Sequence, residues 1–265
     1  MISLPLAAAF ATAVLATSFL SGIFGMAGGM ILMGILLAIM PVAAAMVLHG
    51  VTQMASNGWR AWLWREHIGW AIAGHYAAGA VAAALAFAAL QFAPTKPVAL
   101  IILGLTPFAG LLLPSRWAPD VRRPLNAFGC GAVCTMLMLL AGISGPILDV
   151  CFVRSGLDRK QMVATKAAVQ VLGHLLKIAY FGLAMTAGGA EVAPVAMILA
   201  VVLAIAGTQL SRRALDAISD AQFRIWTRRL IVTIAAFYLA QGLWLLVDLR
   251  AVTDAVTATI ATLLS

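Results

Sequence analysis

The sequence predicts an all-α polytopic membrane protein made of two inverted repeats of about five membrane segments each, with broken or short helices at the midplane. Of its 265 residues, 63% are hydrophobic and only 10% are charged, and the mean hydropathy is +1.04. A soluble domain of this length needs far more charge on its surface. The apolar runs are long and unbroken, unlike the short alternating strands of a membrane β-barrel. The repeats are predicted by an internal duplication whose copies lie 117 residues apart.

Ten apolar segments follow one another along the chain, and the second and seventh are short for a crossing, which needs about 20 residues. If all ten cross, thirteen Lys and Arg residues lie on one side and two on the other, with two inside helices. If the two short segments return to the same side, the split falls to nine against six. The positive-inside rule therefore favours ten crossings with both termini periplasmic. The segments are residues 4–24, 26–40, 42–63, 67–92, 97–114, 123–142, 145–156, 160–184, 192–210 and 226–247.

Five crossings per half is an odd number, so the second half enters the membrane from the opposite side and the repeat is inverted. The N-terminus lacks the basic region of a signal peptide, and we expect it to form the first membrane helix. The formal charge of +8 reflects basic residues beside the spans, so no nucleic-acid partner is expected. The expected units are 1–114, the first repeat; 115–123, a cytoplasmic loop; 124–250, the second repeat; and 251–265, a tail that forms a short interfacial helix.

Each half holds a glycine break followed by a helix with a polar face. The four polar positions recur at i, i+4, i+8 and i+11, so they share one helix face about 16 Å long. Polar side chains are costly inside a membrane, so we expect the two faces to line a cavity or to contact each other. In the second half the residues are Gly142, Ser144, Gly145 and Pro146, then Lys166, Gln170, His174 and Lys177. In the first half they are Gly25, Ala27, Gly28 and Gly29, then His49, Gln53, Asn57 and Arg60.

The breaks are predicted to form an anion site. Ser144 or Gly145 can cap a helix whose first position is Pro146, so that helix begins inside the protein with free backbone donors and a positive dipole end. Gly28 and Gly29 allow the same in the first half, and two such N-termini that face one another attract an anion. The alternative is that the glycines only permit close helix packing.

The polar faces supply the remaining candidates. Lys166 is the best candidate for a functional cation, while amide side chains offer neutral hydrogen bonds. Asp149 either stabilises the dipole of its helix or must be protonated or move when an anion binds, which would make it a coupling residue together with His49. The predicted substrate-binding residues are Gly28, Gly29, Gln53, Asn57, Ser144, Gly145, Lys166, Gln170, His174 and Lys177.

The cysteines are expected to have no chemical role. Cys130, Cys134 and Cys151 fall within membrane segments and form no CxxC or Cys/His motif, so we interpret them as small apolar fillers. No P-loop, zinc signature or haem motif is present, and we expect neither a metal nor another cofactor. The expected partners are a small anionic substrate and the lipid bilayer, and a homodimer is left open.

The second-half sequence GISGPILDVCFVRSGLDRKQMVATKAA, with its duplicated glycine break, resembles the sulfite exporter TauE/SafE family, also called the toluene-sulfonate uptake permease family. The resemblance implies a transporter in the bacterial inner membrane for anions such as sulfite, sulfonates or sulfoacetate, and not an enzyme. The first half departs mildly from the pattern, because GMAGGMIL has no proline after the glycine pair.

Two other functions compete with this interpretation. A passive anion channel of the same fold would differ in saturation and coupling. An intramembrane serine protease is suggested by a faint resemblance to rhomboids in Ser144, within GxSG, and His174. The membrane potential favours anion exit by about 2.3 kcal/mol per charge per 100 mV, so export needs no coupling ion.

Overall fold

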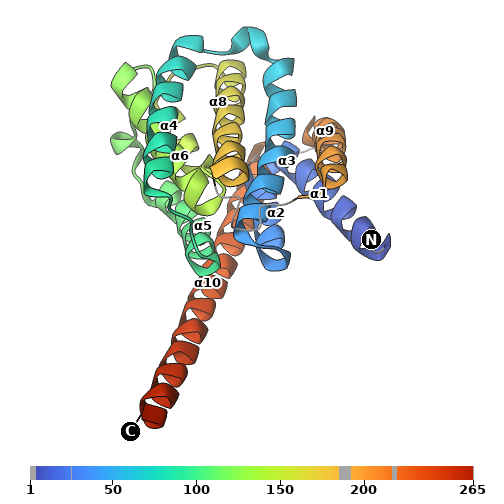
Figure 1. Cartoon of the computed structure of the whole chain (residues 1–265). Coiled ribbons are helices and arrows are strands. Elements are labelled where there is room, and N and C mark those ends of the chain that lie inside the picture. Colours follow the sequence, from blue (N-terminus) through green and yellow to red (C-terminus); the bar gives the residue numbers. More distant parts are fainter. Residues whose placement is uncertain (1–3, 25, 185–191, 217–219, 265) are drawn as a thin grey trace.

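A computed structural model describes residues 4–24, 26–184, 192–216 and 220–264, and every regular element in these ranges is helical (Figure 1). Six of the described helices are long and apolar enough to cross a membrane, which confirms the all-α membrane fold. The first five helices are α1 (Leu4–Phe24), α2 (Met26–Ile39), α3 (Val42–Leu63), α4 (Trp70–Leu90) and α5 (Lys96–Leu112). The next five are α6 (Pro124–Ala141), α7 (Gly145–Phe152), α8 (Arg159–Ala179), α9 (Pro194–Asp216) and α10 (Asp220–Leu264).

The two predicted breaks produce the short helices α2 and α7. Their 14 and 8 residues correspond to about 21 and 12 Å, less than a hydrocarbon core of about 30 Å. Gly142, at a φ of 81°, ends α6 in the left-handed conformation that glycine adopts without strain, and Pro146 lies in the first turn of α7. In the first half α2 begins at Met26 without a proline, while Gly25 lies outside the described residues. Ten full crossings and periplasmic termini stay predictions.

The packing of helices joins the two halves of the chain. The most extensive helix contacts are α4 with α6, α1 with α9, α5 with α10 and α3 with α8. If the five helices of each half correspond in order, so that α1 matches α6 and α5 matches α10, the contact between α4 and α6 corresponds to the contact between α9 and α1. The contacts of α5 with α10 and of α3 with α8 each join a helix to its own counterpart. Along α3, Gly50 lies against Ile178 and Gly58 against Val171, so α3 and α8 run antiparallel. Opposite directions of equivalent helices are what an inverted repeat requires, and the inverted repeat itself stays a prediction.

Helix α10 is longer than predicted. It runs from Asp220 to Leu264 without a break, and its C-terminal part extends away from the other helices (Figure 1). The predicted tail 251–265 therefore continues α10, up to residue 264, and is not a separate helix. A helix of 45 residues measures about 68 Å, more than twice the hydrocarbon core.

The loop between the halves is held by an ion pair. The Asp120 carboxylate accepts hydrogen bonds from Nε and Nη2 of Arg122, which lower the pKa of Asp120 to about 2. Because the pKa is lowered in the folded state, the stabilisation is fully present above the usual value of about 3.9 and is lost as the pH falls through about 2. The pair therefore persists throughout the physiological range.

Candidate functional site: a cationic cavity between the halves

The two predicted polar faces meet in a cavity of about 660 Å³. Gln53, Asn57 and Arg60 line it from α3, and Lys166 and Gln170 line it from α8. Helices α1, α2, α7, α9 and α10 supply the rest of the wall. Five of the eight residues on the two duplicated polar faces thus lie around one space, and both halves of the chain contribute.

The charge of the cavity favours an anion. Arg60, Arg159 and Lys166 are the cationic residues of the described lining, and Asp149 is its acidic residue. Three positive charges against one negative charge leave the cavity with a net positive charge. Because the cavity is only partly open to water, this charge is screened less than it would be at a fully exposed surface.

Several polar atoms of the wall lack a partner. Gln53 Nε2, Ser21 Oγ and Thr227 Oγ1 are buried and have no hydrogen-bond partner among the described residues. All three residues line the cavity. A buried amide or hydroxyl group without a partner costs about 1–3 kcal/mol, so such groups are expected to bind a ligand or water. An oxyanion would satisfy all three as donors.

Lys166 forms a salt bridge with Asp149, which joins α8 to α7 across the cavity. The carboxylate side chain is 45% exposed and the lysine side chain 25%, so both remain accessible from the cavity. The cation that the sequence singled out is therefore neutralised by the one acidic residue of the lining. An anion that binds Lys166 must displace Asp149 or share the lysine with it.

The two short helices begin side by side at the cavity. Met26, the first residue of α2, and Gly145, the first residue of α7, both line it. A methyl group added to Gly145 would lie 2.8 Å from Cβ of Met26, so only glycine permits this approach. The helix dipoles add positive potential at this point. The predicted meeting of two helix N-termini is thus present in the fold.

Three other predicted residues form a separate buried cluster. Lys177 Nζ lies 2.8 Å from His49 Nδ1 and donates to the carbonyl of Gly142 at 3.0 Å, and His49 Nε2 lies 3.0 Å from the carbonyl of Gly29. A carbonyl only accepts, so Nε2 carries the proton and Nδ1 accepts from Lys177. The His174 ring packs against His49, with ring centroids 5.7 Å apart. These contacts connect both broken segments through α3 and α8.

The remaining predictions are placed elsewhere. Gly28, Gly29, Ser144, His174 and Lys177 are not among the residues that line the cavity. A methyl group on Gly28 would lie 2.0 Å from the carbonyl oxygen of a residue in α1, which is the close packing considered as the alternative for these glycines. Ser144 occupies the N-cap position of α7 but makes no side-chain cap bond. Whether any of these residues binds substrate stays a prediction.

Sequence reasoning missed several polar residues of the wall. Ser21 comes from α1, Thr208 and Ser211 from α9, and Thr227 from α10. Hydroxyl groups in apolar helices are common and often bond to their own backbone, as Ser211 Oγ does to the Thr208 carbonyl at 2.6 Å. The available signal was the spacing of Thr208 and Ser211, which places both on one face of α9.

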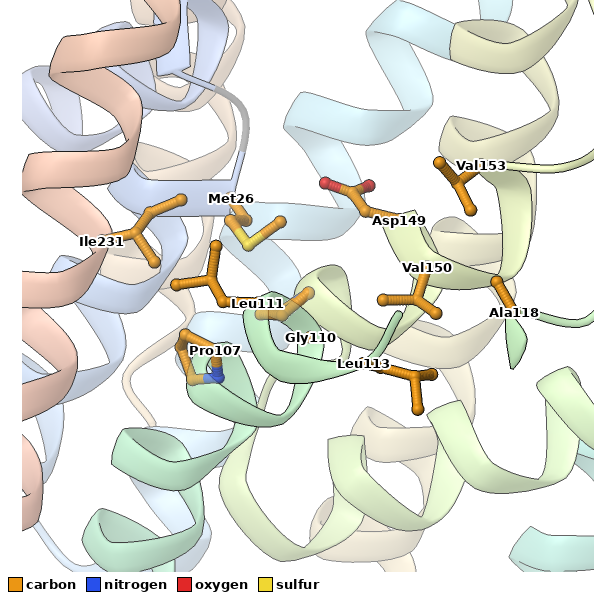
Figure 2. Close-up of a pocket in the computed structure, with 11 residues that line it drawn as sticks. Met26, Pro107, Gly110, Leu111, Leu113, Ala118, Asp149, Val150, Val153 and Ile231 are labelled. Atoms are coloured by element: carbon orange, nitrogen blue, oxygen red, sulfur yellow. The ribbon is translucent and has the colours of Figure 1, made fainter. Parts of the chain in front are cut away.

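A second, smaller cavity of about 280 Å³ adjoins the first. Figure 2 shows the side chains that line it. The two cavities share Met26, Asp149 and Ile231. The other lining residues carry no charge and are apolar. They are Pro107, Gly110, Leu111, Leu113, Ala118, Pro146, Val150 and Val153. Asp149 thus lies between a cationic space and an apolar one.

An all-helical fold with six described helices able to cross a membrane, and a charged cavity where its halves meet, defines the class of multi-pass membrane proteins. The family model for the sulfite exporter TauE/SafE matches residues 9–238. The chain therefore belongs to this family of membrane transporters, as the resemblance in its sequence predicted. No curated protein and no solved structure gives a significant match to the chain.

Proposed function

We propose that this protein is a secondary transporter of the bacterial inner membrane that exports small sulfur-containing oxyanions of the sulfite, sulfonate or sulfoacetate type. The observation that carries the proposal is the cavity in which Arg60, Arg159 and Lys166 outnumber one carboxylate. The starts of α2 and α7 supply backbone donors at the same place, and Gln53 has a free amide donor for a sulfur-bound oxygen.

Substrate binding is proposed to exchange one ion pair for another. In the structure Lys166 pairs with Asp149, so the site carries no free lysine charge. The arriving anion takes the lysine, and the released carboxylate turns away along α7. Because Asp149 also lines the apolar cavity, this movement alters the path between the two spaces. The exchange keeps Lys166 paired in both states, so the lysine is never left as an isolated charge within the membrane.

The apolar cavity favours an anion with a small organic group over bare sulfite. A sulfonate head can lie among the cations while its carbon chain occupies the space beside Leu111 and Val150. Each methylene removed from water in this way contributes about 0.8 kcal/mol. Inorganic sulfite gains nothing from the second cavity.

Val150→Phe should therefore separate the two kinds of substrate. The larger ring fills part of the apolar cavity, and we expect the transport of an organosulfonate to fall at least about tenfold while sulfite transport changes little. The measurement is efflux of each labelled anion from liposomes. Val133→Phe places the same ring on an exposed position of α6 and serves as the matched control. An equal loss for both anions would contradict a selective role for this cavity.

The two alternative functions make different demands. A serine protease needs a hydrogen bond between Ser144 and a base, yet Ser144 Oγ and His174 Nδ1 both lack a partner among the described residues. We expect Ser144→Ala to leave transport largely intact. A passive channel would conduct without saturation, so the dependence of flux on concentration separates it from a transporter.

The deciding experiment uses purified protein in liposomes with an imposed membrane potential. Efflux of labelled sulfite and sulfoacetate is compared with chloride and sulfate, with and without a pH gradient. Saturable, selective efflux that follows the potential supports an exporter that needs no coupling ion. Dependence on the pH gradient would instead show proton coupling, and the absence of any sulfur-anion flux would overturn the proposal.

A further inference from the structure

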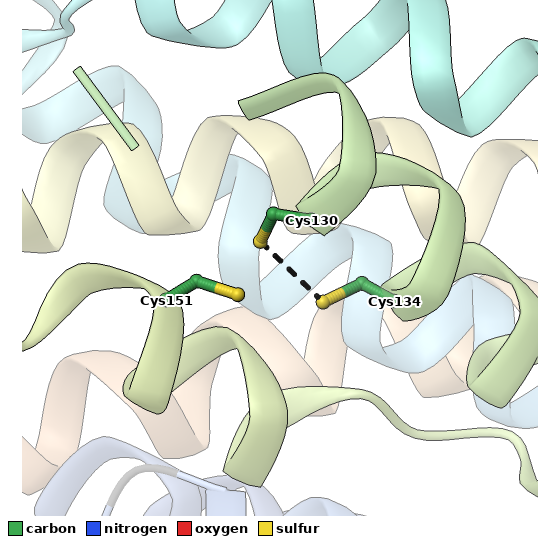
Figure 3. Close-up of side chains that lie close together, drawn as sticks. All are labelled: Cys130, Cys134 and Cys151. Atoms are coloured by element: carbon green, nitrogen blue, oxygen red, sulfur yellow. Dashed lines mark hydrogen bonds between the residues drawn. The ribbon is translucent and has the colours of Figure 1, made fainter. Parts of the chain in front are cut away.

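The structure brings together the three cysteines that the sequence left apart. Cys130 and Cys134 lie one turn apart on α6, and Cys151 reaches the same point from α7 (Figure 3). Their sulfur atoms all lie within 4.8 Å of one another, and all three side chains are buried. The sequence alone indicates small apolar fillers, because nothing in the spacing of the cysteines shows that α7 folds back against α6.

The geometry matches a three-coordinate metal site. Metal–sulfur bonds of about 2.3 Å in a trigonal arrangement place the sulfur atoms about 4.0 Å apart. Cys130 Sγ and Cys134 Sγ are 3.9 Å apart, and the third sulfur needs only a small inward shift. A disulfide would need a sulfur separation of about 2.05 Å, so the present geometry is that of separate thiols.

The donor set selects a soft ion. The group contains sulfur only, with no carboxylate or imidazole, which excludes hard ions such as Mg²⁺ and Ca²⁺. Structural Zn²⁺ takes four ligands, whereas this group has three. Tyr76 lies beside Cys134 in the same buried cluster, and its hydroxyl has no hydrogen-bond partner among the described residues. That hydroxyl can donate to a sulfur atom that has lost its proton.

We propose that Cys130, Cys134 and Cys151 form a binding site for one monovalent, thiophilic metal ion of the Cu(I) type. The thiolate is the metal ligand, so binding of Cu⁺ by the three sulfur atoms releases the three thiol protons, and the Tyr76 hydroxyl can donate to the negatively charged sulfur atoms. No electron is transferred. The ion would fasten the short helix α7 to α6, and because none of the three cysteines lines the anion cavity, this site does not depend on what the cavity transports.

The test uses Cu(I) itself, added without oxygen to the purified full-length protein, in competition with a colorimetric Cu(I) chelator. We expect one copper per chain, an affinity at least 100-fold lower in Cys151→Ala, and no retention in the triple Cys130→Ala, Cys134→Ala, Cys151→Ala variant. Thr135→Ala trims a buried residue of the same helix, leaves every thiol in place and should bind copper normally. Equal retention by the wild type and the triple variant, or retention of Zn²⁺ in place of Cu(I), would overturn the assignment.

A second measurement avoids variants that fail to fold. X-ray absorption on the copper-loaded wild-type protein should show three sulfur neighbours and no nitrogen or oxygen neighbour. Coordination by nitrogen or oxygen would place the ion elsewhere and exclude the cysteine site.

Discussion

Lys166→Ala is expected to weaken sulfonate binding by about 100-fold. A charge-assisted hydrogen bond contributes about 1.5–3 kcal/mol, and the change also leaves Asp149 in the cavity as an unpaired negative charge that repels the substrate. A second substitution, at Asp149, can remove this repulsion. In Lys166→Ala/Asp149→Asn the repulsion is absent, so the affinity should recover to within about tenfold of the wild-type value. Equilibrium binding of labelled sulfoacetate to purified protein measures both changes.

Asp149→Asn alone should act in the opposite direction. It frees Lys166 from its partner, and exposed pairs of this kind contribute about 0.2–1 kcal/mol, so binding should tighten by up to about fivefold. Lys160→Ala removes a charge from the same helix, where the lysine lies over the Trp64 ring, and should leave binding unchanged. If the double variant binds as weakly as Lys166→Ala, the proposed exchange of ion pairs is wrong.

His49→Leu is expected to destabilise the fold by at least about 2 kcal/mol, because it leaves the buried Lys177 nitrogen with one carbonyl acceptor and the Gly29 carbonyl without its donor. Lys177→Met should cost less, since it removes the buried polar nitrogen together with its need for partners. The variants are ranked by heating the purified proteins in detergent and measuring the fraction of each that stays monodisperse at each temperature.

The pair also predicts how the two changes combine. His49→Leu/Lys177→Met should be more stable than His49→Leu, because no buried amine is left unpaired. His75→Leu replaces an exposed histidine of α4 and should have little effect. A double variant whose loss equals the sum of the single losses would show that the two side chains do not depend on each other.

Much of the fold could be predicted from local sequence. Long apolar runs gave nine of the ten helix starts to within three residues, and Gly142 and Pro146 marked the second break, because they act on the backbone where they stand. The start of α10 came six residues earlier than its apolar run, since a helix can continue through polar residues. The end of α10 was missed for the same reason.

Only part of the lining of the candidate cavity could be predicted from the sequence, and the grouping of its residues could not. The duplication identified both polar faces, which were expected to line a cavity or to contact each other, but it did not show which positions of the two faces meet. Because α3 and α8 run antiparallel, the start of one face meets the end of the other. His49 thus contacts Lys177, while Lys166 shares the cavity with Arg60. The periodicity of one sequence shows which residues share a helix face. Whether the neighbouring helix runs parallel or antiparallel to it is seen only in the tertiary structure.

The interleaving of the helices has a consequence for how the protein is made. Helices α1, α3, α4 and α5 each have their most extensive contact with a helix from the second half, which is synthesised later. When the ribosome has completed residues 1–114, these helices have been inserted but lack those partners. Assembly of the cavity therefore has to wait for the C-terminal helices, and a nascent chain that stops at the central loop would leave its polar face from His49 to Arg60 exposed to lipid.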